Sequence, residues 1–282
     1  MDTDNDKDND TTSAEAGLPP TARLPVNHCN LPAAILGGLT YQRYPVALHI
    51  DGVRELHRAF FRMLGTLKKP GERAKRFQDY MIVRFRLNAL EEAGYDPNSK
   101  GDRPKADYRR TLRGWFFDSD SREGAVLKGW AESRFGLLTR FHRALLESPD
   151  SEDYRRFTVE RALGLYNTNA LEAQLDLVYA FTQHELRRRN PTRTHKTLYR
   201  GVNGLKGHEI LRPNANAYIM LMNNMSSFTA SAYRAEEFGS TIIKTSVPLP
   251  KIFFASSLLP GMLQGEEEHI VIGGLYEVMR ID

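Results

Sequence analysis

Cysteine is almost missing from this chain of 282 residues, since Cys29 is the only one. A single cysteine can form neither an internal disulfide nor a thiolate metal cage. No apolar run approaches the ~18 residues that cross a bilayer, so stable membrane insertion is not expected. The N-terminus reads MDTDNDKDND, which is acidic where a secretory signal is basic and then apolar. These absences predict a protein of the reducing cytoplasm.

Several common catalytic motifs are missing as well. The eight histidines include no HExxH and no pair one helical turn apart, so no metal site is predicted. The chain also lacks GxSxG, GxxxxGK[ST] and GxGxxG, the motifs of the nucleophile elbow, the P-loop and the dinucleotide-binding turn. Cys29 follows His28 in a proline-rich segment, where adjacent side chains point opposite ways, so we interpret it as a packing residue.

The composition that remains is globular, with an uneven distribution of charge. Hydrophobic residues make up 41% and charged residues 26% of the chain, enough to bury a sizeable core. Residues 1–18 carry five Asp, one Glu and one Lys, a net charge of −5, while the whole chain carries +4. The rest is therefore basic, which suits an acidic protein or nucleic acid as partner. Solvated helix faces explain the same lysines and arginines more simply.

The chain divides into three parts by composition. Residues 1–18 lack apolar groups and are predicted to form a disordered acidic tail. Residues 19–190 are predicted to hold an extended segment, without a helix up to about Tyr44, and then a helical region. Residues 191–282 contain short runs rich in β-branched residues and are predicted to form a β-rich core. Helices followed by strands favour an α+β fold.

Apolar residues spaced by three and four predict four helices in the middle of the chain. They are expected over Val53–Leu67, Phe77–Ala89, Leu127–Leu145 and Leu171–Leu186.

Two segments of the β-rich part carry residues suited to chemistry. Arg200 and Gly201 lie in a predicted strand, where a guanidinium can face a phosphate while the backbone bends clear; an edge-strand arginine is the alternative. Further on, residues 226–231 read SSFTAS. Their hydroxyls can leave a strand and cap a helix whose face is Ala235 and Phe238. A bare helix cap explains this segment about as well as a functional site does.

A third segment opens a predicted buried strand with three carboxylates. It reads GEEEHIVI over residues 265–272. The strand's period of two places Glu266 and Glu268 on one face and Glu267 on the other. Like charges side by side repel each other, so the pair suggests a task. A solvated loop end is the other interpretation.

Together the three segments resemble the R-S-E signature of arginine-directed mono-ADP-ribosyltransferases. That family has an alanine eight and a phenylalanine eleven residues after its first serine, as Ala235 and Phe238 are placed after Ser227. Its Ser-Thr-Ser reads Ser227-Phe228-Thr229 here, so the first hydroxyl is the one that matches. The stretch 258–265 occupies the place of its target-recognition loop.

The chain after residue 20 also resembles the dinitrogenase reductase ADP-ribosyltransferases of nitrogen-fixing bacteria. The likeness is carried by NHCNLP over residues 27–32, YQRYP over residues 41–45 and GGLYEV over residues 273–278.

These resemblances imply an α+β protein whose residues 191–282 are the NAD⁺-binding catalytic core. NAD⁺ would be a co-substrate, and an acceptor arginine would replace its nicotinamide. The resemblance assigns Glu268 to the oxocarbenium-like transition state and to the ribose 2′-hydroxyl, and Glu266 to activation of the acceptor guanidinium. It assigns Arg200 to the pyrophosphate and Gly201 to a close approach of the nucleotide. Ser227, with Thr229, would brace the NAD⁺ pocket.

The implied partners are the dinitrogenase reductase homodimer as protein substrate and a PII-family nitrogen-signalling protein as regulator. Modification of that iron protein would switch off nitrogen fixation. Other readings stay open: the same fold acting on another protein's arginine or on water as an NAD glycohydrolase, a pseudoenzyme that binds NAD⁺, or a non-catalytic basic module. Nucleic acid is not the expected partner, because the strands lack the basic-plus-aromatic pattern of single-strand binders.

Overall fold

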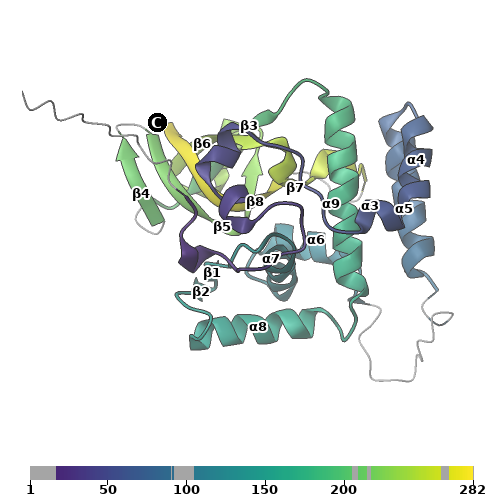
Figure 1. The fold of residues 1–282 in the computed structure, drawn as a ribbon, viewed down its shortest axis with the longest axis horizontal. Helices are drawn as coiled ribbons and strands as arrows, with labels where there is room; N and C mark the ends of the chain where they lie inside the picture. The colour runs from purple at the N-terminus through teal and green to yellow at the C-terminus, as the bar shows by residue number, and fades with distance from the viewer. Residues whose placement is uncertain are drawn as a thin grey trace, which may run out of the picture.

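The computed structural model describes residues 17–89, 91, 105–204, 209–214, 217–261 and 267–281. Up to Arg189 the described chain is mainly helical, with one short hairpin, and the strands of a six-stranded sheet follow from His195 onward. Helices and an antiparallel sheet in this order confirm the predicted α+β class (Figure 1). None of the described helices is both long enough and apolar enough to cross a bilayer.

Ten α-helices lie within the described residues, in chain order from the N-terminus. They are α1 (Ala33–Leu36), α2 (Leu39–Arg43), α3 (Val53–Leu56), α4 (Arg58–Thr66), α5 (Pro70–Phe85), α6 (Tyr108–Phe117), α7 (Arg122–Phe135), α8 (Glu152–Gly164), α9 (Ala170–Arg189) and α10 (Ala232–Ala235).

The helix expected over Leu127–Leu145 is wrong in its second half. Helix α7 ends at Phe135 because Gly136 adopts a left-handed φ of 67°, which closes the helix. A short hairpin of β1 (Phe141–His142) and β2 (Ala144–Leu145) follows instead. The expectation of no helix before Tyr44 is also wrong, because α1 and α2 occupy that segment. Helices α6 and α8 were not expected; each begins at a side-chain cap, Asp107 and Ser151 respectively.

The sheet is antiparallel and is organised around two long strands. Its strands are β3 (His195–Val202), β4 (Glu209–Asn214), β5 (Ala217–Thr229), β6 (Thr241–Pro248), β7 (Ile252–Ala255) and β8 (Glu268–Ile281), in the order β4-β5-β3-β6-β8-β7 with an additional β5–β8 pairing. The β5–β8 register shifts between Met222 and Met225. A Cβ on Gly273 would lie 1.9 Å from the Asn223 carbonyl oxygen, so the two strands pass closely where the ladder is interrupted.

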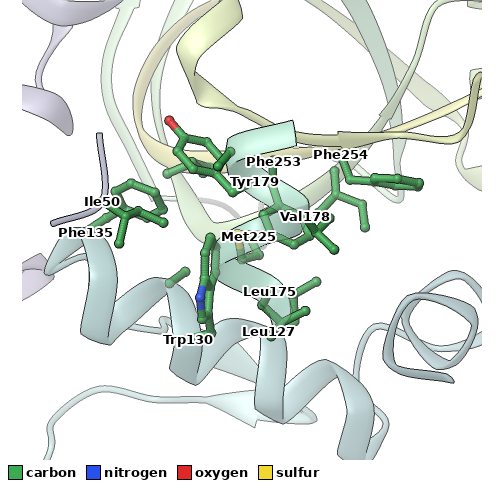
Figure 2. Close-up of a cluster of buried hydrophobic side chains, with 14 of the residues drawn as sticks. Ile50, Leu127, Trp130, Phe135, Leu175, Val178, Tyr179, Met225, Phe253 and Phe254 are labelled. Carbon is green, nitrogen blue, oxygen red and sulfur yellow. The ribbon is translucent and has the colours of Figure 1, made fainter. Parts of the chain in front are cut away.

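The main hydrophobic core is shared by the helices and the sheet. Trp130 of α7 packs 4.8 Å, centroid to centroid, from Phe253 of β7, and Tyr179 of α9 lies in the same cluster. Figure 2 shows these side chains converging with Met225 of β5. The change from helix to strand after Arg189 is therefore not a break in the core. Helices α7 and α9 set the position of the sheet.

Candidate active site

A cleft of about 510 Å³ opens where β3, β5 and β8 meet the end of α6 and the α10 region. Its volume lies within the range of small-molecule sites, ~300–1,000 Å³. The cleft is lined by most of the sequence-predicted site residues, from three separate strands: Arg200, Gly201, Ser227, Thr229 and Glu268. Glu266, the sixth, lies outside the described residues. The tertiary fold thus brings the arginine, serine and second glutamate segments together.

The register of the strands brings these three segments of the chain side by side. Thr229 lies directly opposite Glu268 in the β5–β8 ladder and opposite Tyr199 in the β3–β5 pair. Side chains of directly opposed residues project from the same face at a separation of ~4.5–5.5 Å. Arg200 follows Tyr199, so the end of β5 joins the arginine strand to the glutamate strand.

Arg200 is anchored through one of its donors. Its Nη1 donates to the Ser227 carbonyl oxygen over 2.7 Å. Burial lowers the pKa of Arg200, and the neighbouring Glu268 carboxylate acts in the opposite direction. The guanidinium stays charged, because its ordinary pKa is far above neutrality. It is a partly desolvated cation with donors left over, which is how an anionic group is bound strongly.

Ser227 is held by a residue that the sequence analysis missed. Trp115, buried at the end of α6, donates from Nε1 to Ser227 Oγ over 2.9 Å. A hydroxyl that accepts one hydrogen bond keeps its own proton for a ligand. The sequence does contain a pattern that predicts α6. Tyr108, Leu112 and Trp115 follow the capping Asp107 at a spacing typical of a helix.

Gly201 has no side chain, and the space that this leaves is occupied by the backbone of α10. A Cβ at this position would lie 2.0 Å from the Ala235 carbonyl oxygen. The close approach is thus between β3 and α10, and it brings the residues after α10 to the cleft. Thr229 Oγ1 accepts from the Ser231 amide over 3.2 Å, and Ser231 Oγ accepts from the Arg234 amide over 3.3 Å. The predicted helix cap is confirmed, and it stands beside the cleft.

Two aromatic side chains at the cleft are unusually exposed. Phe117, the last residue of α6, is 94% exposed, and Phe238 is 61% exposed. Both line the cleft, together with Asp118 and Ser119 of the turn after α6. Exposed aromatic faces of this kind suit the planar rings of a ligand.

The start of the strand that carries Glu268 is held in place by hydrogen bonds of His269. His269 is buried and lies with Nε2 2.7 Å from Lys196 Nζ and Nδ1 3.2 Å from the Glu267 carbonyl oxygen. Burial, followed by the Lys196 charge, lowers the pKa of His269 to about 4. The ring is therefore neutral at pH 7, accepting from Lys196 and donating to Glu267. This holds the backbone just ahead of Glu268.

A second cavity of about 330 Å³ adjoins the cleft. Arg200, Ser227, Trp115 and Ser119 line both spaces. Its lining also includes Lys128, which is buried and paired with Asp120 at 2.6 Å between Nζ and Oδ1. Arg200 therefore borders both spaces, where its remaining donors can reach an anionic group at their junction.

Known proteins place this chain in a family. Residues 26–280 match the family described as "Dinitrogenase reductase ADP-ribosyltransferase". The NAD(+)--dinitrogen-reductase ADP-D-ribosyltransferase of Rhodospirillum rubrum is 38% identical over 257 residues, which span 89% of this chain and 93% of the relative. The chain belongs to the dinitrogenase reductase ADP-ribosyltransferase family. No solved structure gives a significant match.

Proposed function

We propose that this protein is a mono-ADP-ribosyltransferase that moves ADP-ribose from NAD⁺ to an arginine of dinitrogenase reductase and releases nicotinamide. The observation that carries the proposal is the convergence of Arg200, Ser227 and Glu268 in one cleft. It occurs in a chain of the family whose Rhodospirillum rubrum relative bears that name.

The two joined spaces suggest how the dinucleotide lies. A pyrophosphate is the centre of NAD⁺, and Arg200 is the cation shared by both cavities. With the pyrophosphate on Arg200, the nicotinamide ribose extends toward Ser227 and Glu268, and the adenosine extends toward Lys128. Thr229, through the turn that it holds, supports the Glu268 side.

The reaction breaks the bond between ribose C1′ and the nicotinamide nitrogen. Nicotinamide leaves as a neutral molecule with the bonding electron pair, and positive charge spreads over the ribose ring. The Glu268 carboxylate stabilises that cation, more strongly in a water-poor cleft than in bulk water. An acceptor guanidinium nitrogen then bonds to C1′ and loses a proton. By its spacing from Glu268, Glu266 is the base for that proton.

The partners of the reaction belong to the same proposal. A bulky anionic group on dinitrogenase reductase would obstruct its electron-transfer contact, so the enzyme acts as an off-switch for nitrogen fixation in the cytoplasm. Regulation by a PII-family nitrogen-signalling protein is supported by the family resemblance alone.

Labelled NAD⁺ tests the proposal directly. The protein is incubated with NAD⁺ labelled in the adenylate and with purified dinitrogenase reductase. In a parallel sample, a lysate without dinitrogenase reductase takes the place of the purified acceptor. We expect label on an arginine of dinitrogenase reductase and stoichiometric nicotinamide release. Label on other proteins only would indicate another acceptor, and release without label would indicate an NAD glycohydrolase. Absence of nicotinamide release in both samples would contradict any catalytic assignment.

A further inference from the structure

A second groove lies on the helical side of the molecule, between α3, α4 and the last turns of α9. Figure 1 shows α4 alongside α9 on the side remote from β4. The groove measures about 470 Å³, and none of its lining residues lines the NAD⁺ cleft. Its charged lining comprises one carboxylate, Glu55, and five arginines: Arg54, Arg58, Arg62, Arg187 and Arg188. We call it the arginine groove.

Two of the arginines, Arg58 and Arg62, are placed against the preferences of their helix. They lie four residues apart in α4, and like charges at that spacing destabilise a helix. Arg58 is the first residue of α4, where the helix dipole already carries partial positive charge. Arg187 and Arg188 approach them from the end of α9.

Contacts within the protein offset little of this repulsion. Arg188 donates to the carbonyl oxygens of Gly65 and Leu67, over 2.8 and 3.2 Å. In the part of the chain that the structure describes, the other four arginines make no ion pair or side-chain hydrogen bond. Burial lowers the pKa of Arg54, and the neighbouring charge of Arg187 lowers it further.

One residue of the groove lining, His184, carries an unsatisfied polar atom. His184 Nε2 is buried and has no hydrogen-bond partner among the described residues. The His184 ring packs against Phe61 at 5.9 Å between centroids, and both side chains line the groove. A buried nitrogen without a partner is costly, which adds to the cost that the crowded arginines impose on this part of the molecule.

We propose that the arginine groove docks an acidic segment of a partner protein. Arg58 and Arg62 lie one turn apart on α4, ~6 Å along its axis, and the arginines of α3 and α9 extend the positive charge beyond them, which matches carboxylates repeated along a chain. Arginine forks bind carboxylates in a bidentate manner. A single phosphate would need the donors to converge, and single-stranded nucleic acid would need several exposed stacking rings. The inference is independent of the proposed catalytic function, because the groove and the cleft have no residue in common.

A fluorescein-labelled octaglutamate peptide is the probe, with binding followed by fluorescence anisotropy. We expect the full-length protein to bind it, and more weakly when salt rises from about 50 to about 300 mM, since screening shortens the reach of exposed charges. In the double variant Arg58→Glu/Arg62→Glu the affinity falls about tenfold or more, because each exposed ion pair contributes a few-fold and reversal adds repulsion.

The control variant Arg76→Glu/Arg155→Glu makes the same change of charge on exposed positions of α5 and α8. It should bind the peptide as the wild type does. NAD⁺ binding, measured in parallel, reports whether each variant is folded. If the double variant unfolds, Arg62→Gln/Arg187→Gln replaces it, with a loss of several-fold expected.

Two outcomes would overturn the proposal. One is equal peptide affinity in the wild type and a folded groove variant. The other is a wild type that binds inorganic pyrophosphate or a thymidine oligonucleotide through Arg58 and Arg62 in preference to the peptide. That result would make the groove a phosphate site. Neither outcome bears on the NAD⁺ cleft, which the labelled NAD⁺ experiment tests.

Discussion

At the scale of single residues, the candidate site depends on charges that have little water around them. Arg200 is anchored to Ser227 and lies near Glu268, while Trp115 fixes the Ser227 hydroxyl. A cation and a carboxylate prearranged in this way need little reorganisation when a charged transition state forms. Removing the charge of Glu268 and removing that of Glu266 should therefore have different effects.

Glu268→Gln should abolish turnover while leaving NAD⁺ binding nearly intact. The amide is isosteric but carries no charge to stabilise the ribose cation, and groups of this kind contribute ~10²–10³ in rate. Nicotinamide release and the NAD⁺ dissociation constant, measured on the same preparation, check this. Parallel loss of both quantities would mean that Glu268 is structural.

Glu266→Gln should abolish transfer to arginine but spare part of the NAD⁺ hydrolysis. A guanidinium has a pKa above ~12 and needs a base to become a nucleophile, whereas water needs less activation. The measurement compares labelled acceptor with free ADP-ribose. Undiminished arginine transfer would remove the role assigned to Glu266.

At the scale of elements, the cleft is assembled by close packing of secondary structure from both halves of the chain. Helix α6 supplies Trp115, and α10 lies against β3 where Gly201 leaves no space for a side chain. The β5–β8 register then places Thr229 beside Glu268. Disturbing one of these contacts should displace a whole wall of the cleft.

Gly201→Ala is the sharpest test of the β3–α10 contact. Its Cβ would overlap the Ala235 carbonyl oxygen, so we expect unfolding free energy to fall by ~1–3 kcal/mol and NAD⁺ to bind more weakly. Urea denaturation and NAD⁺ titration measure the two effects. Gly65→Ala in α4 is the control, because nothing lies within 4 Å of its Cβ and alanine favours a helix by up to ~1 kcal/mol. A Gly201→Ala protein as stable as the wild type would contradict the packing argument.

At the scale of the whole molecule, one core and a few buried polar side chains join the helices to the sheet. Gln42 of α2 donates from Nε2 to Thr245 Oγ1 of β6 over 3.1 Å and accepts from the Glu277 amide of β8 over 2.7 Å. Arg73 of α5 and Glu185 of α9 form a buried pair. Lys251 is fully buried, with Nζ 2.7 Å from the Gly273 carbonyl oxygen.

Lys251 should make stability depend on pH. Burial lowers its pKa to about 7, whereas an unfolded lysine titrates near ~10.4. Between these values the unfolded chain binds a proton that the folded chain does not, so stability rises with pH, by up to ~1.4 kcal/mol per unit. Below pH 7 Lys251 is protonated in both the folded and the unfolded state, and the destabilisation caused by its buried charge reaches its full value.

Lys251→Met should therefore flatten the rise in stability between pH 7 and 9, as measured by urea unfolding at several pH values. Its absolute stability is a separate matter, because the Gly273 carbonyl loses its donor. Lys75→Met, at an exposed position of α5, should keep the wild-type slope. An unchanged slope in Lys251→Met would mean that the lysine titrates normally in the fold.

The sequence by itself determined the α+β class, the β-rich character of residues 191–282 and several of the residues that line the cleft. Spacing and residue type are local, so Arg200, Ser227 and Glu268 could be read from short segments. Helix ends were less accessible: Gly136 is of a residue type that often ends helices, but the apolar spacing continues past it to Leu145, and the left-handed φ of Gly136 decided the end of α7. Only the tertiary structure decided that Trp115 holds Ser227, that Gly201 serves the packing of α10, and that distant arginines gather in one groove. Those relations depend on how strands and helices pair across the core, and pairing is set by the fit of whole surfaces rather than by neighbours in the chain.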